Sequence, residues 1–167
     1  MTGAVIRILG VDPGLRRTGW GLVGAQGSRL SFFACGAIET KSNEPMAVRL
    51  VHILRSLTDL AAEHHPDEAA IEETFVNRDP QSALKLGQAR GVAMAALAGA
   101  GLDVAEYAAN VVKKTVVGVG HADKNQVATM VKILLPLSGA KSADAADALA
   151  VAICHAQHRI ARMRGAA

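Results

Sequence analysis

Hydrophobic and polar positions alternate along much of the first forty residues, a period typical of β-strands. The pattern predicts strands over residues 4–11, 18–24 and 29–40. Asp12-Pro13-Gly14 is a turn signal that ends the first strand, and a short turn at residues 25–28 separates the second strand from the third. Connections this short join antiparallel neighbours, so a three-stranded meander is expected.

From residue 46 onward the period lengthens to that of an amphipathic helix. Met46, Leu50 and Leu54 share one stripe, which predicts a helix that ends near His64-His65-Pro66 because proline cannot continue it. Further strands are expected over residues 68–72 and 102–107, and further helices over residues 82–98, 123–135 and 142–162. Strands joined through a helix pair in parallel by right-handed crossovers. The pattern therefore predicts an α/β fold with a mixed five-stranded sheet, three antiparallel strands followed by two parallel ones, and helices on both faces.

The composition agrees with one folded domain over residues 1–167. Hydrophobic residues make up 50% of the chain and charged residues 20%, which excludes a disordered chain. Cys35 and Cys154 are too few for a disulfide framework or a zinc site. Neither a signal peptide nor an apolar run of ~20 residues is apparent, so we expect a soluble, cytoplasmic protein with no membrane partner. The net charge of +3 permits an acidic polymer as partner without requiring one.

Asp147 is the acidic residue that a structural role explains least. The segment 143–153 is apolar almost all round, apart from Asp144 and Asp147, and such helices are buried. Desolvating a carboxylate is costly unless it is paired or bound to a metal. Alternatively, both are first-turn carboxylates that favour the helix dipole, with Ser142 as N-cap. That alternative suits Asp144 better than Asp147, which lies deeper in the helix.

Asp12 and Glu72 each end a short apolar strand. Open α/β sheets bind ligands beyond the carboxyl ends of their strands. The structural alternatives are a plain turn aspartate at Asp12 and a solvated strand end at Glu72-Glu73. Neighbours on a strand point to opposite faces, so at most one of Glu72 and Glu73 should join a shared site.

Converging carboxylates repel one another and need a cation. All-oxygen ligands suit Mg²⁺ or Mn²⁺ rather than zinc. Two such ions about 3.5–4 Å apart are the usual device for phosphodiester cleavage. A cluster of Asp12, Glu72, Asp144 and Asp147 would therefore indicate a metal-dependent nuclease.

Basic residues lie beside these acidic positions. Lys113, Lys114 and Lys124 bracket residues 115–121, which we interpret as a glycine-bearing loop region that could meet phosphates. Arg16 and Arg17 follow Asp12, and Arg78, Lys85 and Arg90 follow Glu72. The alternative for each lysine is solvated surface.

Phe75 stands out because the chain has so few aromatic residues. On a loop after Glu72 it could stack on an unpaired base. It could equally pin its loop to the body of the protein. The histidines show no ligand spacing with cysteine, and we expect His155 and His158 on a helix surface.

Five ordered segments of the sequence resemble the RuvC family of crossover (Holliday) junction endodeoxyribonucleases. They are LGVDPG at 9–14 with TG at 18–19, AIE at 70–72, SALKLGQARG at 82–91, VKKTVVG at 112–118 and DAADALA at 144–150. The resemblance covers nearly the whole chain and implies an RNase H-like fold.

The resemblance also implies an activity and partners. It implies a homodimer that binds four-way junction DNA and nicks two strands of like polarity symmetrically, with RuvA and RuvB as partners. The family's catalytic, metal-binding positions fall on Asp12, Glu72, Asp144 and Asp147, which sets Glu73 aside. Its junction-contacting aromatic falls on Phe75, and its two important lysines fall on Lys113 and Lys124. The expected cofactor is a pair of Mg²⁺ ions per subunit, for which Mn²⁺ could substitute.

Three other functions compete with this interpretation. The turn at Asp12-Pro13-Gly14 could belong to an actin-like ATPase or kinase, but those proteins need two such domains. A catalytically silent junction-binding protein would lack a carboxylate, and all four are present. An RNase H-like nuclease with another nucleic-acid substrate shares the chemistry, so substrate competition must separate it.

Overall fold

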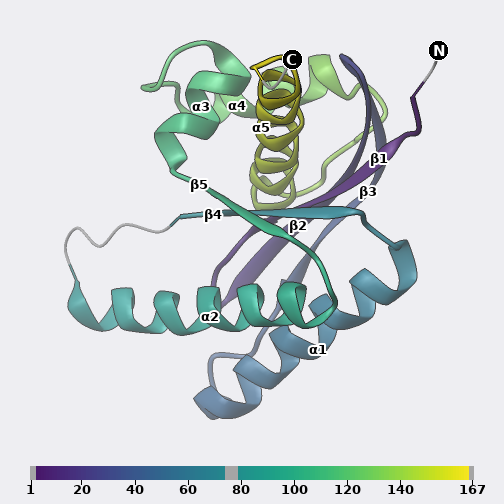
Figure 1. Cartoon of the computed structure of the whole chain (residues 1–167). Coiled ribbons are helices and arrows are strands. Elements are labelled where there is room, and N and C mark those ends of the chain that lie inside the picture. Colours follow the sequence, from purple (N-terminus) through teal and green to yellow (C-terminus); the bar gives the residue numbers. More distant parts are fainter. Residues whose placement is uncertain (1–2, 74–78, 166–167) are drawn as a thin grey trace.

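A mixed five-stranded sheet forms the centre of the protein (Figure 1). The computed structural model describes residues 3–73 and 79–165, except the side chains of residues 162–164. The strands are β1 (Ile6–Asp12), β2 (Arg17–Gln26), β3 (Arg29–Glu39), β4 (Glu68–Glu72) and β5 (Val104–Tyr107). Their order in the sheet is β3-β2-β1-β4-β5, with β1, β2 and β3 antiparallel and with β4 parallel to both β1 and β5. The predicted meander and the two parallel additions are confirmed.

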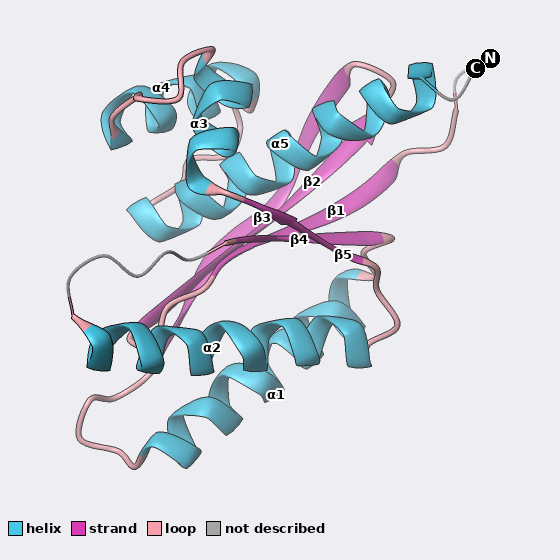
Figure 2. Cartoon of the chain, turned by 60° about the vertical axis from the view of Figure 1, so that its left-hand side comes forward, coloured by secondary structure: helices cyan, strands magenta, loops and turns pink. Residues whose placement is uncertain are grey.

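Helices cover both faces of this sheet (Figure 2). The helices are α1 (Met46–His64), α2 (Pro80–Gly99), α3 (Ala109–Val117), α4 (Lys124–Leu134) and α5 (Ala143–Gly165). Helices α1 and α2 lie on one face, whereas α3, α4 and α5 lie on the other (Figure 1). No described helix combines the length and apolar character needed to cross a membrane.

The central strands are apolar on both sides because they lie between these two helical layers. On β1, Leu9 and Val11 face the α1 and α2 layer, whereas Ile8 faces α5. On β4, Ala69 and Ile71 face α1 and α2, and Ala70 faces α5. Strand alternation therefore directs Glu68 and Glu72, which share the parity of Ala70, toward the α5 face.

Two expectations from the sequence were wrong. Residues 115–117, expected in a loop region, form the last turn of the helix α3, and Lys113 and Lys114 project from that same helix. Val112 and Val116, one helical turn apart, are buried there, and the helix ends at Gly118 in a left-handed conformation. His155 is 5% exposed and not on a helix surface, because it lies where α5 crosses the sheet.

Candidate active site

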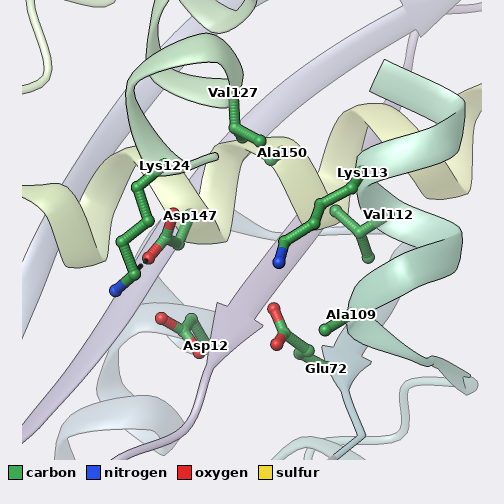
Figure 3. Close-up of a pocket in the computed structure, with 9 residues that line it drawn as sticks. All are labelled: Asp12, Glu72, Ala109, Val112, Lys113, Lys124, Val127, Asp147 and Ala150. Atoms are coloured by element: carbon green, nitrogen blue, oxygen red, sulfur yellow. Dashed lines mark ion pairs between the residues drawn. The ribbon is translucent and has the colours of Figure 1, made fainter. Parts of the chain in front are cut away.

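Three of the four predicted carboxylates line one cavity beside the sheet. Asp12 is the last residue of β1, Glu72 the last of β4, and Asp147 lies on the second turn of α5. Figure 3 shows the three side chains around the same space, with Lys113 from α3 and Lys124 from α4 extending into it. Residues more than a hundred positions apart in the sequence are thus brought together.

The register of the parallel strands explains why Asp12 and Glu72 are neighbours. Val11 pairs with Ile71, so the next residue of each strand lies at the same edge of the sheet. Side-chain alternation then places Glu72 on the α5 side, whereas Glu73 does not line the cavity. This arrangement agrees with the expectation that at most one of Glu72 and Glu73 joins a shared site.

Close contact between α5 and the sheet requires two glycines. A Cβ on Gly10 of β1 would overlap the main-chain oxygen of Ala148, and a Cβ on Gly19 of β2 would overlap that of Asp144. Both obstacles are backbone atoms, so a side chain at either position would push α5 away from the strands. By allowing α5 to approach β1 and β2, the two glycines determine the separation between Asp147 on the helix and Asp12 at the strand end.

Asp144 lies in the first turn of α5 and does not line the cavity. Ser142 caps this helix end, because its Oγ accepts the main-chain N–H of Ala145 at 3.1 Å. The helix-start alternative thus describes the surroundings of Asp144 correctly. Asp144 still interacts electrostatically with the site. Its charge adds to the rise in the pKa values of Asp12 and Asp147 that burial causes.

Burial and mutual repulsion make ionisation of these carboxylates unfavourable and so raise their pKa values. Burial, followed by repulsion from Glu72, Asp147 and Asp144, raises the pKa of Asp12 to about 8. Burial also raises the pKa of Glu72, with a contribution from Asp147. Burial raises the pKa of Asp147 too, although the Lys124 ammonium opposes it. Within the part of the chain that the structure describes, the lysines do not bring enough positive charge to offset this cost.

The donor set suits a hard divalent cation. All the carboxylate oxygens around the cavity are ligands of the kind that Mg²⁺ and Mn²⁺ prefer. Within the described ranges, no three His, Cys, Asp or Glu side chains are grouped tightly enough to hold an ion by themselves. Mg²⁺ usually takes one or two carboxylates and completes its shell with water and substrate phosphate, so an open arrangement of this kind fits it.

Two lysines bring partial compensation to the carboxylates. Lys124 Nζ lies 3.7 Å from Asp147 Oδ2, and the Lys124 side chain is 81% exposed (Figure 3). Lys113 extends toward Glu72, and its charge partly opposes the rise in the pKa of Glu72 that burial causes. A long, exposed lysine can exchange a carboxylate for a phosphate at little cost, since such ion pairs contribute about 0–1 kcal/mol.

The other predicted nucleic-acid contacts are away from this cavity or outside the described residues. Lys114 is exposed on α3, and Lys85 is exposed on α2, and neither lines the cavity. Phe75 and Arg78 lie outside the described residues. Arg90, which the sequence placed among the basic neighbours of Glu72, instead donates from Nε to the main-chain oxygen of Glu72 at 3.2 Å.

The cavity also has an apolar wall that the sequence did not reveal. Ala109, Val112, Val127 and Ala150 come from three helices and complete its lining. Its volume of about 170 Å³ is below the ~300–1,000 Å³ of typical small-molecule pockets. This size suits ions and one phosphate group better than a whole nucleotide.

Comparison with known proteins gives the same family in sequence and in structure. A family model described as crossover junction endodeoxyribonuclease RuvC matches residues 8–155. The protein of that name from Methylocella silvestris is 64% identical over 162 residues, covering 97% of this chain and 92% of the relative. The structure of RuvC from T. thermophilus in complex with Holliday junction substrate has a TM-score of 0.87 at 33% identity, covering 95% of this chain and 96% of that one.

A more distant structure shares the fold alone. The yeast mitochondrial Holliday junction resolvase has a TM-score of 0.68 at 12% identity, covering 96% of this chain and 84% of that one. The α/β sheet is the RNase H-like fold expected from the sequence. Because a family model and close relatives match nearly the whole length, the chain belongs to the RuvC family of crossover junction endodeoxyribonucleases.

Proposed function

We propose that this chain is a metal-dependent endonuclease that resolves four-way (Holliday) junctions during recombination and DNA repair. It would nick two strands of like polarity symmetrically. The observation that carries the proposal is the cavity where Asp12, Glu72 and Asp147 meet two lysines, in a chain of this family. A structure of a relative with 33% identity holds the junction substrate, which supports the same substrate here.

Asp12, Glu72, Asp144 and Asp147 would hold two Mg²⁺ ions per subunit, with Mn²⁺ as a possible substitute. When bound, the metal supplies an activated water and neutralises charge on the attacking and leaving oxygens. Asp12 lines the same cavity as Glu72 and Asp147, and both carboxylates add to the rise in its pKa that burial causes, so Asp12 would be the central residue of the set that holds the metal. The apolar wall around Val112 and Val127 limits bulk water beside the carboxylates.

Positively charged residues would hold the DNA backbone. Lys113 and Lys124 are placed to contact the phosphate next to the scissile bond, because both extend into the cavity. Lys85 and Lys114 are exposed and would contact phosphates farther away. We also assign Phe75 and Arg78 to the junction, on the sequence alone. Phe75→Ala should slow cutting more than it weakens binding if the ring stacks on an opened base pair.

A homodimer would place two such sites on one junction. The outward face of α2 is our candidate for the contact between subunits. Leu84 is 70% exposed there, and Gly87 and Gly91 have open space around them. RuvA and RuvB are further expected partners. We also propose that residues 1–167 act as a single nuclease domain in the cytoplasm.

Substrate competition tests this function against a related nuclease with another substrate. A synthetic four-way junction is offered with linear duplex and RNA–DNA hybrid, in Mg²⁺ and then in Mn²⁺, with Asp147→Asn as the inactive control. Paired symmetric nicks on the junction alone are expected. Equal cutting of all three substrates would support the alternative, and no cutting by the wild type would overturn both.

A further inference from the structure

Arg90 connects helix α2 to the strand end that carries Glu72. Its Nε donates to the main-chain oxygen of Glu72 at 3.2 Å, and its Nη2 forms an ion pair with Glu106 Oε2 on β5. The Arg90 side chain is 20% exposed, compared with 42% for Glu106. One guanidinium thus bridges a helix and two neighbouring strands.

The helix that carries Arg90, α2, is anchored by buried side chains on the α1 and α2 face of the sheet. Ala89 and Ala93, the residues just before and three after Arg90, are fully buried against the sheet. Helix α2 packs chiefly against α1 and also meets β5, and the long Arg90 side chain spans the remaining distance to the end of β4. The backbone at Arg90 is therefore held in place by the buried residues on either side of it.

Glu72 lies where the sheet gives its backbone less support. The pairing of β1 with β4 stops at Val11 and Ile71, one residue before Glu72. On the other side Glu72 still pairs with Tyr107, and the N–H of Glu73 donates to the Tyr107 oxygen at 2.8 Å. Arg90 adds a charged donor to the Glu72 peptide itself.

We propose that Arg90 is a positioning residue for the metal site, and that Glu106 orients its guanidinium. By fixing the Glu72 peptide, Arg90 sets where the Glu72 carboxylate enters the cavity. It does so without touching metal or substrate. The inference rests on the proposed function, because it assumes that Glu72 is a metal ligand.

Arginine suits this position better than lysine. The planar guanidinium presents several donors in a fixed fork, so it can bind the carbonyl oxygen and the carboxylate at once. A lysine ammonium in the same place would reach one partner and leave the other unsatisfied. The rigid guanidinium therefore fixes the Glu72 peptide relative to α2 and β5.

Metal binding without DNA tests the proposal by a readout other than activity. Mn²⁺ affinity is measured by electron paramagnetic resonance on wild-type, Arg90→Ala, Arg90→Lys and Glu106→Gln proteins. Loss of an outer-shell partner commonly weakens metal affinity about 10–100-fold. We expect about 10-fold weaker Mn²⁺ binding for Arg90→Ala, and smaller losses for Arg90→Lys and Glu106→Gln.

Leu97→Ala is the matched control for general loss of stability. Leu97 lies on the same helix, is fully buried in the core on the α1 and α2 face of the sheet, and does not line the cavity. Its variant should unfold more readily yet bind Mn²⁺ as the wild type does. If Arg90→Ala fails to fold, Arg90→Lys and Glu106→Gln are compared with Leu97→Ala instead.

Each outcome decides one question. If Arg90→Ala binds Mn²⁺ as Leu97→Ala does, Arg90 is structural and this inference is overturned. If Arg90→Ala weakens binding of a four-way junction while Mn²⁺ affinity is unchanged, Arg90 is a DNA contact and the inference is also overturned. Failure of the wild type itself to bind Mn²⁺ would instead overturn the proposed function.

Discussion

Strand β4 carries two glutamates on the same face, with opposite electrostatic surroundings. Glu68, at the start of the strand, accepts hydrogen bonds from His155 Nε2 and Arg159 Nε, each at 2.7 Å. These partners lower the pKa of Glu68 despite its burial. Glu72, at the end of the strand, lies beside further carboxylates, and burial together with Asp147 raises its pKa. Among the described residues, the two ends of one short strand thus separate a carboxylate with hydrogen-bond donors from a carboxylate beside like charges.

The same helix provides both environments. The later turns of α5 offer His155 and Arg159 to Glu68, whereas its first turns offer Asp144 and Asp147 to the Glu72 end. His155 also contacts the Tyr107 hydroxyl through Nδ1 at 2.9 Å. Glu68, which stabilises the fold, has the Arg159 cation and the His155 ring as partners within the chain. In the proposed function, Glu72 instead takes a metal cation from solution.

The largest expected difference between the two ends is in activity. Glu72→Gln should lower single-turnover junction cleavage by at least ~100-fold, since the loss of a metal ligand exceeds the effect of losing an outer partner. Glu68→Gln should cleave within about twofold of the wild type where both are folded. Junction affinity, measured by fluorescence anisotropy, should stay unchanged in both. Equal activity of the two variants would contradict the comparison.

The pH dependence of stability should reveal the raised pKa of Asp12, which lies beside Glu72 in the carboxylate cluster. The pKa of Asp12 is about 8 in the folded protein and 3.8 in an unperturbed chain. Between these values the unfolded chain releases a proton that the folded chain retains. The free energy of unfolding without metal therefore falls from about pH 4 to about pH 8, and Asp12 alone contributes at most ~1.4 kcal/mol per pH unit to this fall. Glu72 and Asp147 add to this fall.

Asp12→Asn should remove much of that slope. Chemical denaturation at pH 4 and pH 8, with a chelator present, measures the free energy of unfolding of both proteins. The variant should exceed the wild type by a few kcal/mol at pH 8 and by little at pH 4. Identical slopes in the two proteins would show that Asp12 ionises normally.

The two glutamates of β4 should change stability in opposite directions when they are neutralised. At pH 7 without metal, Glu68→Gln should lower the free energy of unfolding by about 1–3 kcal/mol, because Arg159 and His155 lose a charged partner. Glu72→Gln should leave stability unchanged or raise it. Because the pKa of Glu68 is lowered, its contribution is present above pH 4.5 and is lost as the pH falls below that value.

An exposed ion pair gives the smallest expected effect. Arg17 Nη2 lies 2.9 Å from Glu39 Oε1, and both side chains are at least half exposed. Glu39→Gln should change the free energy of unfolding by less than about 1 kcal/mol in the same denaturation assay. A loss as large as that of Glu68→Gln would mean that burial does not separate the two pairs.

Local sequence patterns predicted the elements that depend on local periodicity. The strand ends at Asp12 and Glu72 and the apolar helix around Asp147 were sufficient to predict converging carboxylates. The sequence predicts a loop region over residues 115–121 because of its glycines, and it does not reveal the helix that ends at Val117. A nine-residue helix gives too short a repeat to stand out.

Contacts between distant segments were beyond such patterns. His155 was expected at the surface, but its partner Glu68 lies 87 positions earlier in the chain. The link from Arg90 to Glu72 likewise depends on how α2 docks below β4. Neither contact follows a sequence period, so only the folded arrangement of strand and helix reveals it.

The most direct test of whether Asp12, Glu72 and Asp147 form a cation-binding site is the gain in stability when metal is added. The melting temperature of wild-type protein and Asp12→Asn is measured at pH 8 with chelator and with saturating Mg²⁺. We predict that Mg²⁺ raises the melting temperature of the wild type by several degrees, because a ligand that binds the folded state alone stabilises it. Asp12→Asn should begin higher and gain much less. An equal gain in both proteins, or none in the wild type, would contradict the account.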